Sequence, residues 1–520
     1  MAKFIDCRSN QLPEFTAEVC IVGLGAAGAT LATQLDAKGV ETIVIEAGAE
    51  NIESQTQDLY AMSQTGVPYY DMTSCRLRYL GGTTNHWGGF CRANDPIDYL
   101  GRRDLGIPAW PFDFEHIRPY FVEAATLLGL TEEGFDPYHQ AAKRQVPKKQ
   151  LLEEHSDLLT TKVFQISRNR NFFREVQIPK LATSGTADVL LNANVVHIQL
   201  SDDGRRVVKI TAKTMNGRTF DIRAKRFVLA AHAVENARLL LASNDVAKDG
   251  IGNGSDHVGR YFMEHPHIHS GVMIPTGKFP GFYNYDQMRR VNLNANLGLT
   301  EKAMRAEGVL QYYCRFNPVY SREQTAEAIR DLKSSFWEPG DLDALKSLGE
   351  LVSNVPDSLR FVQSRRSPEK AVPVLYNLEH RIEQSPNPSS RIQLLDEKDA
   401  LGMRKAVLSW QLSDLDIMTF QRGQKVIVDE LTRLGMGRFE LSEIDRTLVE
   451  SEVAGHYHHI GTTRMSTDAT QGVVDADCRV HGVENLYVSG SGVFPTSGYS
   501  GPTMMIVAMA IRLSQHLHRQ

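Results

Sequence analysis

Residues 18–46 read EVCIVGLGAAGATLATQLDAKGVETIVIE, which is an apolar strand, a glycine turn, a helix and a second strand. Gly23 permits a tight turn, Gly25 lets a pyrophosphate approach the backbone, and Gly28 lets the helix and strand pack closely. Glu46 ends the second strand, where its carboxylate would accept hydrogen bonds from ribose hydroxyls. This βαβ unit predicts a dinucleotide site; a tight packing turn without a ligand is the alternative.

Length and composition point to an ordinary globular protein. A chain of 520 residues exceeds what one hydrophobic core usually organises, so two domains are expected. Apolar residues make up 42% of the chain and charged residues 23%. The net charge is −5 and the Lys and Arg residues are scattered, which argues against nucleic-acid binding. The six cysteines lack C-x-x-C spacing, so neither a metal site nor a disulfide framework is predicted.

The N-terminal segment and the lengths of the apolar runs bear on the cellular location of the protein. The N-terminal segment is polar and lacks the order of basic, apolar and small residues that marks a signal peptide. No window holds ~18 uninterrupted apolar residues, so no membrane span is predicted. We therefore expect a cytoplasmic protein.

A glycine-rich cluster bears on which dinucleotide binds, because the first turn does not separate FAD from NAD. In residues 78–89, RYLGGTTNHWGG, two glycine pairs bracket a polar and aromatic core. Because Gly82 has no side chain, its backbone can lie against a flat ring system. Asn85 and His86 offer hydrogen-bonding or nucleophilic groups at the edge of such a ring. An elaborate turn without a ligand is the alternative.

The remaining cluster is C-terminal, HYHHIGTTRM at 456–465 followed by GVVDADCRVHGVENLYVSGSGVFPTSGYSGPTMM at 472–505. With the first glycine turn, the GGTTNHWGG stretch and the crossover VLAAHAVENARLLLAS at 228–243, it makes the chain resemble the glucose-methanol-choline oxidoreductases. The four motifs occur in that family's order and span essentially the whole chain. The resemblance implies that FAD lies extended across the first domain and that the C-terminal segment returns to complete the flavin site.

The predicted fold class is α/β. The resemblance implies a Rossmann-like FAD-binding domain built from discontinuous segments, and an α+β substrate domain with an antiparallel sheet. We expect residues 1–264 to form the FAD-binding domain, with loop excursions at 56–110 and 130–180. Residues 265–450 would form the substrate-binding domain, and residues 451–520 would complete the FAD domain and the active site.

The resemblance also implies roles at the cofactor. The predicted cofactor-binding residues are Gly23, Gly25, Gly28, Glu46, Gly82, Asn85, His86, Val195, Ser489, Gly490, Ser491 and Thr503. Val195 matches the position whose backbone contacts adenine, and 489–491 fall in the segment that meets the pyrophosphate and the flavin. In several family members the histidine matching His86 is bonded to the flavin methyl group. Two states of the FAD therefore stay open, covalent through His86 or noncovalent.

Two histidines are the predicted catalytic residues. By the resemblance, His458, three residues before a Gly-Thr pair, is the base. A neutral imidazole can accept the hydroxyl proton as hydride leaves the carbinol carbon for the flavin. His459 either contacts the flavin or substrate or has a structural hydrogen-bonding role.

Two positions depart from the family pattern. Gly501 stands where the family usually has Asn or His, so it offers no side chain to bind the substrate oxygen. His459, Tyr499, Ser500 or a water held by Gly501 would have to substitute. His232 stands where the crossover usually has Gly, and it would crowd the turn unless it has a ligand or a hydrogen-bond partner.

Three functions are compatible with these motifs. The first is FAD-dependent oxidation of an alcohol, such as a polyol, sugar or glycoside hydroxyl, with oxygen, a quinone or a redox protein as electron acceptor. The second is lyase, isomerase or ring-forming chemistry at a flavin, motivated by the bare position at Gly501. The third is a partner-dependent subunit of an electron-transfer complex.

Overall fold

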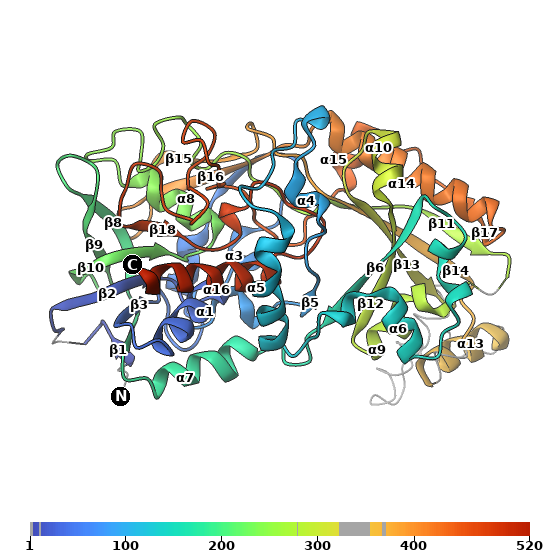
Figure 1. Cartoon of the computed structure of the whole chain (residues 1–520), viewed down its shortest axis with the longest axis horizontal. Helices are drawn as coiled ribbons and strands as arrows, with labels where there is room; N and C mark the ends of the chain where they lie inside the picture. Colours follow the sequence, from blue (N-terminus) through green and yellow to red (C-terminus); the bar gives the residue numbers. More distant parts are fainter. Residues whose placement is uncertain (1–3, 10–11, 278, 322–353, 367–370) are drawn as a thin grey trace, which may run out of the picture.

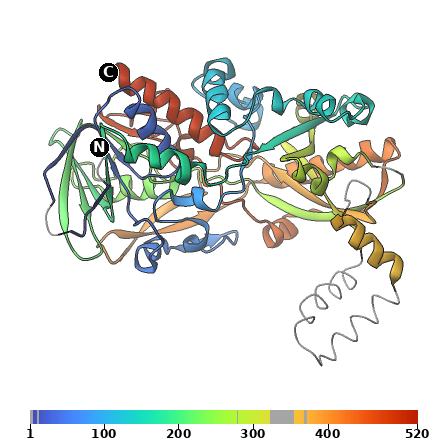
Figure 2. The same ribbon diagram turned by 90° about the horizontal axis from the view of Figure 1, so that it is seen from below.

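The computed structural model describes residues 4–9, 12–277, 279–321, 354–366 and 371–520. Figures 1 and 2 show two parts side by side along the longest axis, with both ends of the chain in the same part. That part contains a mainly parallel sheet, and the other contains an antiparallel sheet. The predicted fold class, α/β with a parallel nucleotide-type sheet and a second antiparallel sheet, is confirmed.

The first sheet has a parallel core. Its order is β1 (Phe4–Asp6), β7 (Ala187–Leu191), β3 (Thr42–Ile45), β2 (Phe15–Val22), β10 (Thr219–Leu229), β9 (Val207–Lys213) and β8 (Asn194–Leu200), and β18 (Leu486–Val488) also pairs with β10. The neighbouring strands β1, β7, β3, β2 and β10 are parallel, and β18 is parallel to β10. Strands β9 and β8 extend the sheet in antiparallel fashion. Segments far apart in the sequence therefore share one sheet.

Three long helices cover this sheet. They are α1 (Ala26–Asp36), α5 (Phe114–Leu127) and α16 (Thr503–Arg519), and α16 packs against both of the others. Residues 507–514 of α16 are all buried, so this helix is enclosed on every side over two turns. Basic residues occupy its last turn, where they interact favourably with the helix dipole.

The second sheet is antiparallel. Its order is β17 (Gly437–Glu440), β11 (His267–Pro275), β14 (Leu375–Ile382), β13 (Tyr312–Val319), β12 (Leu293–Leu299), β6 (Leu159–Ile166) and β5 (Phe90–Cys91). Helix α14 (Asp414–Arg433) packs on β12, β13 and β14. A capping box of Ser413 and Asp416 starts this helix.

A third sheet has three strands. It consists of β15 (Arg391–Lys398), β16 (Arg404–Trp410) and β4 (Ser63–Gly66), and β15 packs on α8 (Ala233–Ala242). The other α-helices are α2 (Ser54–Gln57), α3 (Met72–Cys75), α4 (Ile97–Leu100), α6 (Pro137–Lys143), α7 (Ile178–Ala182), α9 (Tyr285–Arg290), α10 (Glu301–Glu307), α13 (Val355–Arg366) and α15 (Arg446–Glu452). Within the described residues, every helix is too short or too polar to cross a bilayer.

The predicted loop excursions need correction. Residues 130–180 contain β6, an eight-residue strand of the antiparallel sheet, where the sequence was expected to be irregular. The run TTKVFQI within β6 is rich in β-branched residues, but its partner β12 lies more than a hundred residues away in the chain. Residues 56–110 hold the strands β4 and β5 and the short helices α3 and α4. The limits of the domains stay a prediction.

Candidate active site

A cavity of about 440 Å³ lies between the parallel and antiparallel sheets. The predicted residues that line it are Gly23, Gly25, Glu46, Gly82, His86, Val195, His458, His459, Ser489, Gly490, Ser491 and Thr503. Gly28 and Asn85 are outside the lining. The fold thus brings the N-terminal turn, the 78–89 loop and the C-terminal segment to one place.

The first glycine turn is as tight as the spacing predicts. Gly23 has a φ of +101°, and a Cβ there would lie 2.6 Å from the carbonyl oxygen of Ala230. A Cβ on Gly28 would lie 1.9 Å from the carbonyl oxygen of Gly23. A Cβ on Gly25 would meet nothing within 4 Å, because Gly25 borders the cavity. Gly28 therefore acts in packing, while Gly25 leaves space at the start of α1.

Glu46 is buried at the edge of the cavity. Its two carboxylate oxygens accept hydrogen bonds from the backbone N–H groups of Leu24, at 3.1 Å, and Gly48, at 3.0 Å. Burial raises the pKa of Glu46, and these two donors partly offset that effect. Each oxygen keeps a further lone pair for a ligand donor.

The 78–89 loop divides its polar residues between structure and cavity. The Asn85 amide donates to the carbonyl oxygens of Leu80, at 3.0 Å, and Gly82, at 2.8 Å, so it holds the loop together. The His86 ring lies on the cavity wall, and partial burial lowers its pKa. Of the two predicted polar residues, Asn85 and His86, it is His86 that lines the cavity.

The C-terminal segment contributes a polar atom without a partner. The Ser489 hydroxyl is buried and has no hydrogen-bond partner among the described residues, and Ser489 lines the cavity. Thr503, the first residue of α16, lies on the same wall. A buried hydroxyl of this kind needs a ligand or water to satisfy it.

His458 is held by a second histidine. Its Nδ1 lies 2.8 Å from Nδ1 of His265, and Nε2 of His265 lies 3.2 Å from the carbonyl oxygen of Ser497. Because a carbonyl only accepts, Nε2 of His265 carries its proton and Nδ1 accepts. His458 must then donate from Nδ1, which leaves its Nε2 as a free lone pair.

Gly501 faces this free lone pair. A Cβ built on Gly501 would lie 3.5 Å from Nε2 of His458 and 3.4 Å from its Cε1. Both residues line the cavity. The missing side chain at 501 therefore leaves open the space in front of the unprotonated nitrogen of His458.

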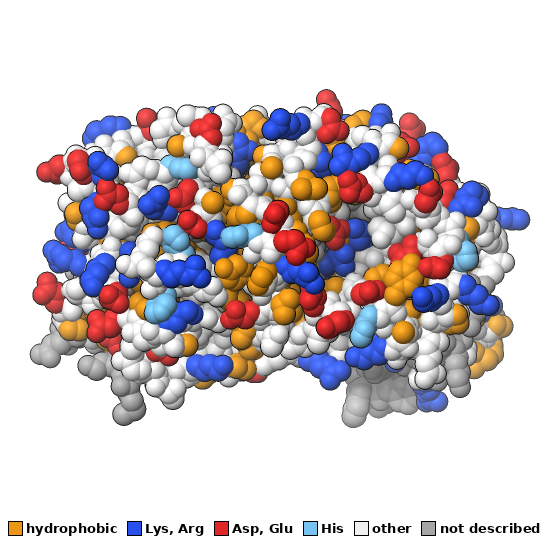
Figure 3. All heavy atoms as spheres, in the orientation of Figure 1, with side chains coloured by type: hydrophobic (Ala, Val, Ile, Leu, Met, Phe, Trp, Pro, Cys, Tyr) orange, Lys and Arg blue, Asp and Glu red, His pale blue; other side chains and the backbone are white. Residues whose placement is uncertain are grey.

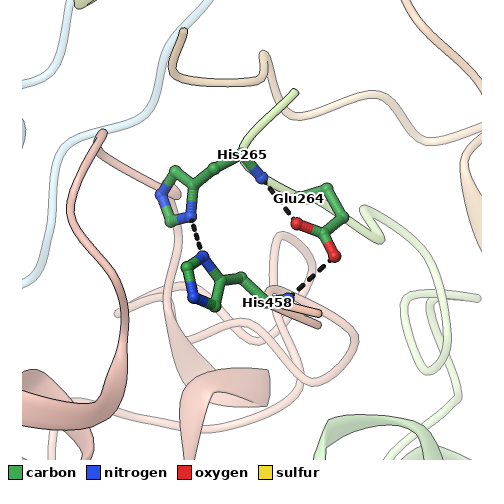
Figure 4. A group of neighbouring side chains, drawn as sticks. All are labelled: Glu264, His265 and His458. Carbon is green, nitrogen blue, oxygen red and sulfur yellow. Dashed lines mark hydrogen bonds between the residues drawn. The ribbon is translucent and has the colours of Figure 1, made fainter. Parts of the chain in front are cut away.

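Glu264 fixes the backbone that carries His458. Figure 4 shows its carboxylate accepting the backbone N–H of His265 and of His458, each at 2.8 Å. It also accepts the backbone N–H of His456, at 2.9 Å, and the Tyr69 hydroxyl. Burial raises the pKa of Glu264, whereas four donors stabilise its ionised form. The carboxylate thereby ties the 456–458 loop to β11.

His459 and His232 belong to a directed chain of hydrogen bonds. The Val234 N–H donates to Nδ1 of His232, whose Nε2 lies 2.9 Å from Nδ1 of His459. Nε2 of His459 lies 2.9 Å from the Tyr69 hydroxyl, which donates to Glu264. Each group in this chain donates onward, so both histidines are neutral. Burial lowers the pKa of His232 to about 3, which agrees with this assignment.

The unusual residue His232 therefore has a structural explanation. It caps α8 and has a φ of +83°, a backbone conformation that side chains rarely adopt. Such strain persists where the surroundings impose it. Here the hydrogen bonds of its two ring nitrogens, one with Val234 and one with His459, hold the residue in place.

The side chains named as substitutes for the residue missing at 501 are engaged elsewhere. Both ring nitrogens of His459 are bonded. The Tyr499 hydroxyl donates to Asp95 and accepts from Arg92, and the Ser500 hydroxyl donates to a carbonyl oxygen at 3.3 Å. Another nitrogen without a partner belongs to His456: its buried Nδ1 has no hydrogen-bond partner among the described residues, and its ring centroid lies 5.8 Å from that of His458.

Replacing Tyr69 by Phe tests the hydrogen-bond chain. Without the hydroxyl, the Nε2–H of His459 loses its acceptor and Glu264 loses one of four donors. We expect Tyr69→Phe to lower the free energy of unfolding by about 1–3 kcal/mol, because buried polar groups are left unpaired. Urea unfolding measures the change. Tyr457→Phe is the matched control, since Tyr457 is 45% exposed; equal stability of the two variants would contradict the role of Tyr69.

Sequence reasoning missed three residues of this site: His265, Glu264 and Tyr69. Glu264 and His265 open the run EHPHIH, in which histidines alternate in a strand-like pattern. That pattern was the available signal, since residues at spacing two share one face of a strand. Tyr69 carries no comparable signal, because its contacts depend on the folding of the 56–110 segment.

Comparisons with known proteins agree with this geometry. Residues 386–510 match the family described as GMC oxidoreductase. The large subunit of fructose dehydrogenase from Gluconobacter japonicus is 23% identical, over 96% of this chain and 97% of the relative. The 2-methyl-1,2-propanediol dehydrogenase of Mycolicibacterium austroafricanum is also 23% identical, over 97% and 95%.

A solved structure resembles the whole chain. The crystal structure of pyridoxine 4-oxidase from Mesorbium loti superposes with a TM-score of 0.61 at 16% identity. The match covers 97% of this chain and 99% of that structure. At this identity the likeness bears on the fold, and it places both sheets within one known architecture.

Proposed function

Because this chain belongs to the glucose-methanol-choline oxidoreductases, enzymes that act on CH–OH groups, we propose that it oxidises an alcohol or sugar hydroxyl with FAD as the cofactor and His458 as the base. One observation carries the proposal. The Nε2 lone pair of His458 is free and faces open space beside Gly501 in the cavity. A base needs such an unprotonated nitrogen within reach of the substrate hydroxyl.

The cavity fits an extended dinucleotide. Gly25 leaves room at the N-terminus of α1, where backbone N–H groups favour a pyrophosphate. The orphaned hydroxyl of Ser489 offers a further polar contact, and the lone pairs of Glu46 suit ribose hydroxyls. Gly82 and His86 would lie along the flavin.

His458 would remove the proton from the substrate hydroxyl. Bound FAD supplies the acceptor for the hydride that leaves the carbinol carbon. The proton from the hydroxyl goes to Nε2 of His458, which is oriented by the hydrogen bond of Nδ1 to His265. Glu264 holds the backbone of both histidines, so the base is positioned before the substrate binds. We assign His459 to positioning, because both of its nitrogens are engaged.

The pH dependence of flavin reduction checks this base. Burial, and after it the neighbouring His265, lowers the pKa of His458 well below its usual value. A base acts in its neutral form, so activity is lost only as the pH falls through this lowered pKa. We expect the rate of anaerobic flavin reduction to be constant from about pH 6.5 to about pH 9 and to fall below that range. A limb centred at or above about pH 6.5, the usual pKa of an imidazole, would contradict the assignment.

A substrate panel tests the function itself. Purified protein is expected to show a protein-bound flavin spectrum, and anaerobic mixing with polyols, sugars and glycosides should bleach the oxidised band. Turnover without net bleaching would instead favour lyase or isomerase chemistry, and bleaching only after addition of a copurified protein would favour an electron-transfer subunit. A protein without flavin would refute the proposal.

Covalent attachment through His86 stays a prediction with a direct test. The ring lies on the cavity wall, as attachment requires. Acid precipitation leaves a yellow pellet if the flavin is bonded to the protein and a yellow supernatant if it is not. In the first case His86→Ala should release the colour into the supernatant.

A further inference from the structure

The cavity wall formed by the antiparallel sheet contains a buried guanidinium, that of Arg315, which has an ion pair with Glu379 but no hydrogen bond to a described residue. We propose that Arg315 and Arg381 form a subsite for a carboxylate, so that the substrates of this enzyme are small hydroxy acids such as sugar acids. This inference rests on the proposed function, because it describes the substrate of the same cavity. Both arginines line that cavity together with His458.

Strand register places the subsite. In the pairing of β13 with β14, Tyr313 lies opposite Arg381, and Arg315 lies opposite Glu379. Residues two apart on a strand share a face, so these four side chains form one polar patch on the sheet. On the other side of β14, Arg381 lies opposite His267 of β11.

Arg315 is buried without a hydrogen bond. Its side chain is 9% exposed, and its guanidinium donates no hydrogen bond to any described residue. Its ion pair with Glu379 is 3.6 Å long, beyond hydrogen-bonding distance. It packs against the Tyr285 ring, 4.5 Å from the centroid. A guanidinium in such a position has donors available for a bidentate anion.

Arg92 shows what a satisfied buried arginine looks like in this protein. Its guanidinium donates to the Tyr499 hydroxyl, to the carbonyl oxygen of Val163 at 2.9 Å and to Asp95 at 2.8 Å. It does not line the cavity. Of these two buried arginines, Arg315 borders the cavity and lacks such partners.

The charge of the patch favours a monoanion. Arg315 and Arg381 carry two positive charges, and Glu379 supplies one negative charge. Glu379 is largely engaged by Arg381 and by the Asn317 amide at 3.0 Å. Burial and the charge of Arg381 lower the pKa of Arg315, as expected for an undercompensated cation. Figure 3 shows Lys and Arg side chains inside the hollow between the two parts of the molecule.

A metal ion is the competing occupant. Ligand atoms of His267, His456 and Glu379 lie within 4.8 Å of one another, and Nδ1 of each histidine is buried without a partner among the described residues. However, two guanidiniums flank Glu379, and their positive charge opposes a cation. The same unpartnered nitrogens suit the polar groups of a hydroxy acid.

The subsite lies close to the base. The His456 ring lies 5.8 Å from the His458 ring, and His456 belongs to the same cluster as Glu379. A short molecule can therefore place its carboxylate on Arg315 while its hydroxyl reaches Nε2 of His458. This spacing suits a hydroxy acid more than a long-chain alcohol.

Binding to matched pairs tests the proposal without turnover. The holoenzyme is titrated calorimetrically with glycerate and glycerol, gluconate and glucitol, and glucuronate and glucose, with glucose 6-phosphate as a dianionic probe. We expect at least one acid to bind about 10- to 100-fold more tightly than its neutral partner, as for a charge-assisted hydrogen bond. The proposal is overturned if no acid is preferred, or if the phosphate binds more tightly than every acid.

Variants of the patch separate charge from packing. Arg315→Met should abolish the preference for acids. Arg315→Lys should retain part of it, because a lysine keeps the positive charge but cannot donate two parallel hydrogen bonds to one carboxylate. Glu379→Gln leaves two uncompensated cations and should strengthen anion binding. Arg205→Met, on an exposed arginine, is the matched control. An undiminished preference in Arg315→Met would refute the subsite.

Failure of this inference can be told apart from failure of the proposed function. Acid preference without flavin reduction by any compound would leave the subsite standing and remove the proposed oxidation. Flavin reduction by neutral alcohols, with no preference for acids in binding, would do the opposite. If Zn²⁺ at millimolar concentration binds to the protein and displaces bound glucuronate, the site binds a cation instead of an anion. That result would overturn the subsite.

Discussion

His458→Ala is expected to slow flavin reduction by a substrate alcohol about 10²- to 10⁴-fold, the usual contribution of a positioned general base. The physical reason is the single free nitrogen. Nδ1 of His458 is hydrogen-bonded to His265, and only Nε2 of His458 faces the space beside Gly501. Stopped-flow measurement of the oxidised flavin band under anaerobic conditions gives the rate directly.

Two further variants keep this prediction falsifiable. His458→Asn retains a polar side chain that can donate to His265, so it guards against a purely structural loss. His139→Ala removes an exposed histidine of α6 and should leave the rate unchanged. Reduction at the rate of the unmodified protein in both His458 variants would remove this residue from the chemistry.

Gly28→Ala is expected to prevent formation of the flavin site. A Cβ at this position would lie 1.9 Å from the carbonyl oxygen of Gly23, which directly follows β2, whereas Gly28 itself belongs to α1. The turn must move, at a cost of about 3–5 kcal/mol in the free energy of unfolding. We expect little soluble protein and no bound flavin, measured by yield, thermal midpoint and the ratio of flavin to protein.

Gly25→Ala separates packing from cofactor binding. A Cβ at Gly25 meets no protein atom within 4 Å, so the fold should survive, but the methyl group would occupy space at the start of α1 that a pyrophosphate needs. We expect normal stability and flavin affinity about 10-fold weaker, or about 1.4 kcal/mol. Gly185→Ala, at an exposed glycine with open surroundings, is the control. Unchanged flavin retention in Gly25→Ala would contradict the predicted site.

Local signals predicted the first glycine turn and the helix that follows it. The spacing of Gly23, Gly25 and Gly28 encodes a turn within a few residues, and the structure forms that turn. Strand β6 was missed because a strand is stabilised by its partners, and its partner β12 is distant in sequence. The 56–110 segment was expected to lack secondary structure, yet β4 finds a parallel partner in β16.

The site could be predicted only in part, because its geometry depends on distant pairs. His265 and His458 are 193 residues apart, and their contact fixes which nitrogen of His458 is free. The pairing of Arg315 with Glu379 likewise follows from the register of β13 and β14. Motifs identify the chemistry of single residues, whereas hydrogen-bond direction and charge balance arise from the tertiary fold.

The position of α16 has a consequence for biosynthesis. A ribosome makes α1 and α5 early, but the helix that packs on both of them is the last of the described elements to emerge. Strand β18, which pairs with the central strand β10, also comes late. Until then the nascent chain exposes apolar faces. Such a chain is prone to aggregation and is a substrate for chaperones. Translation must therefore pass α16 before this half of the molecule can close.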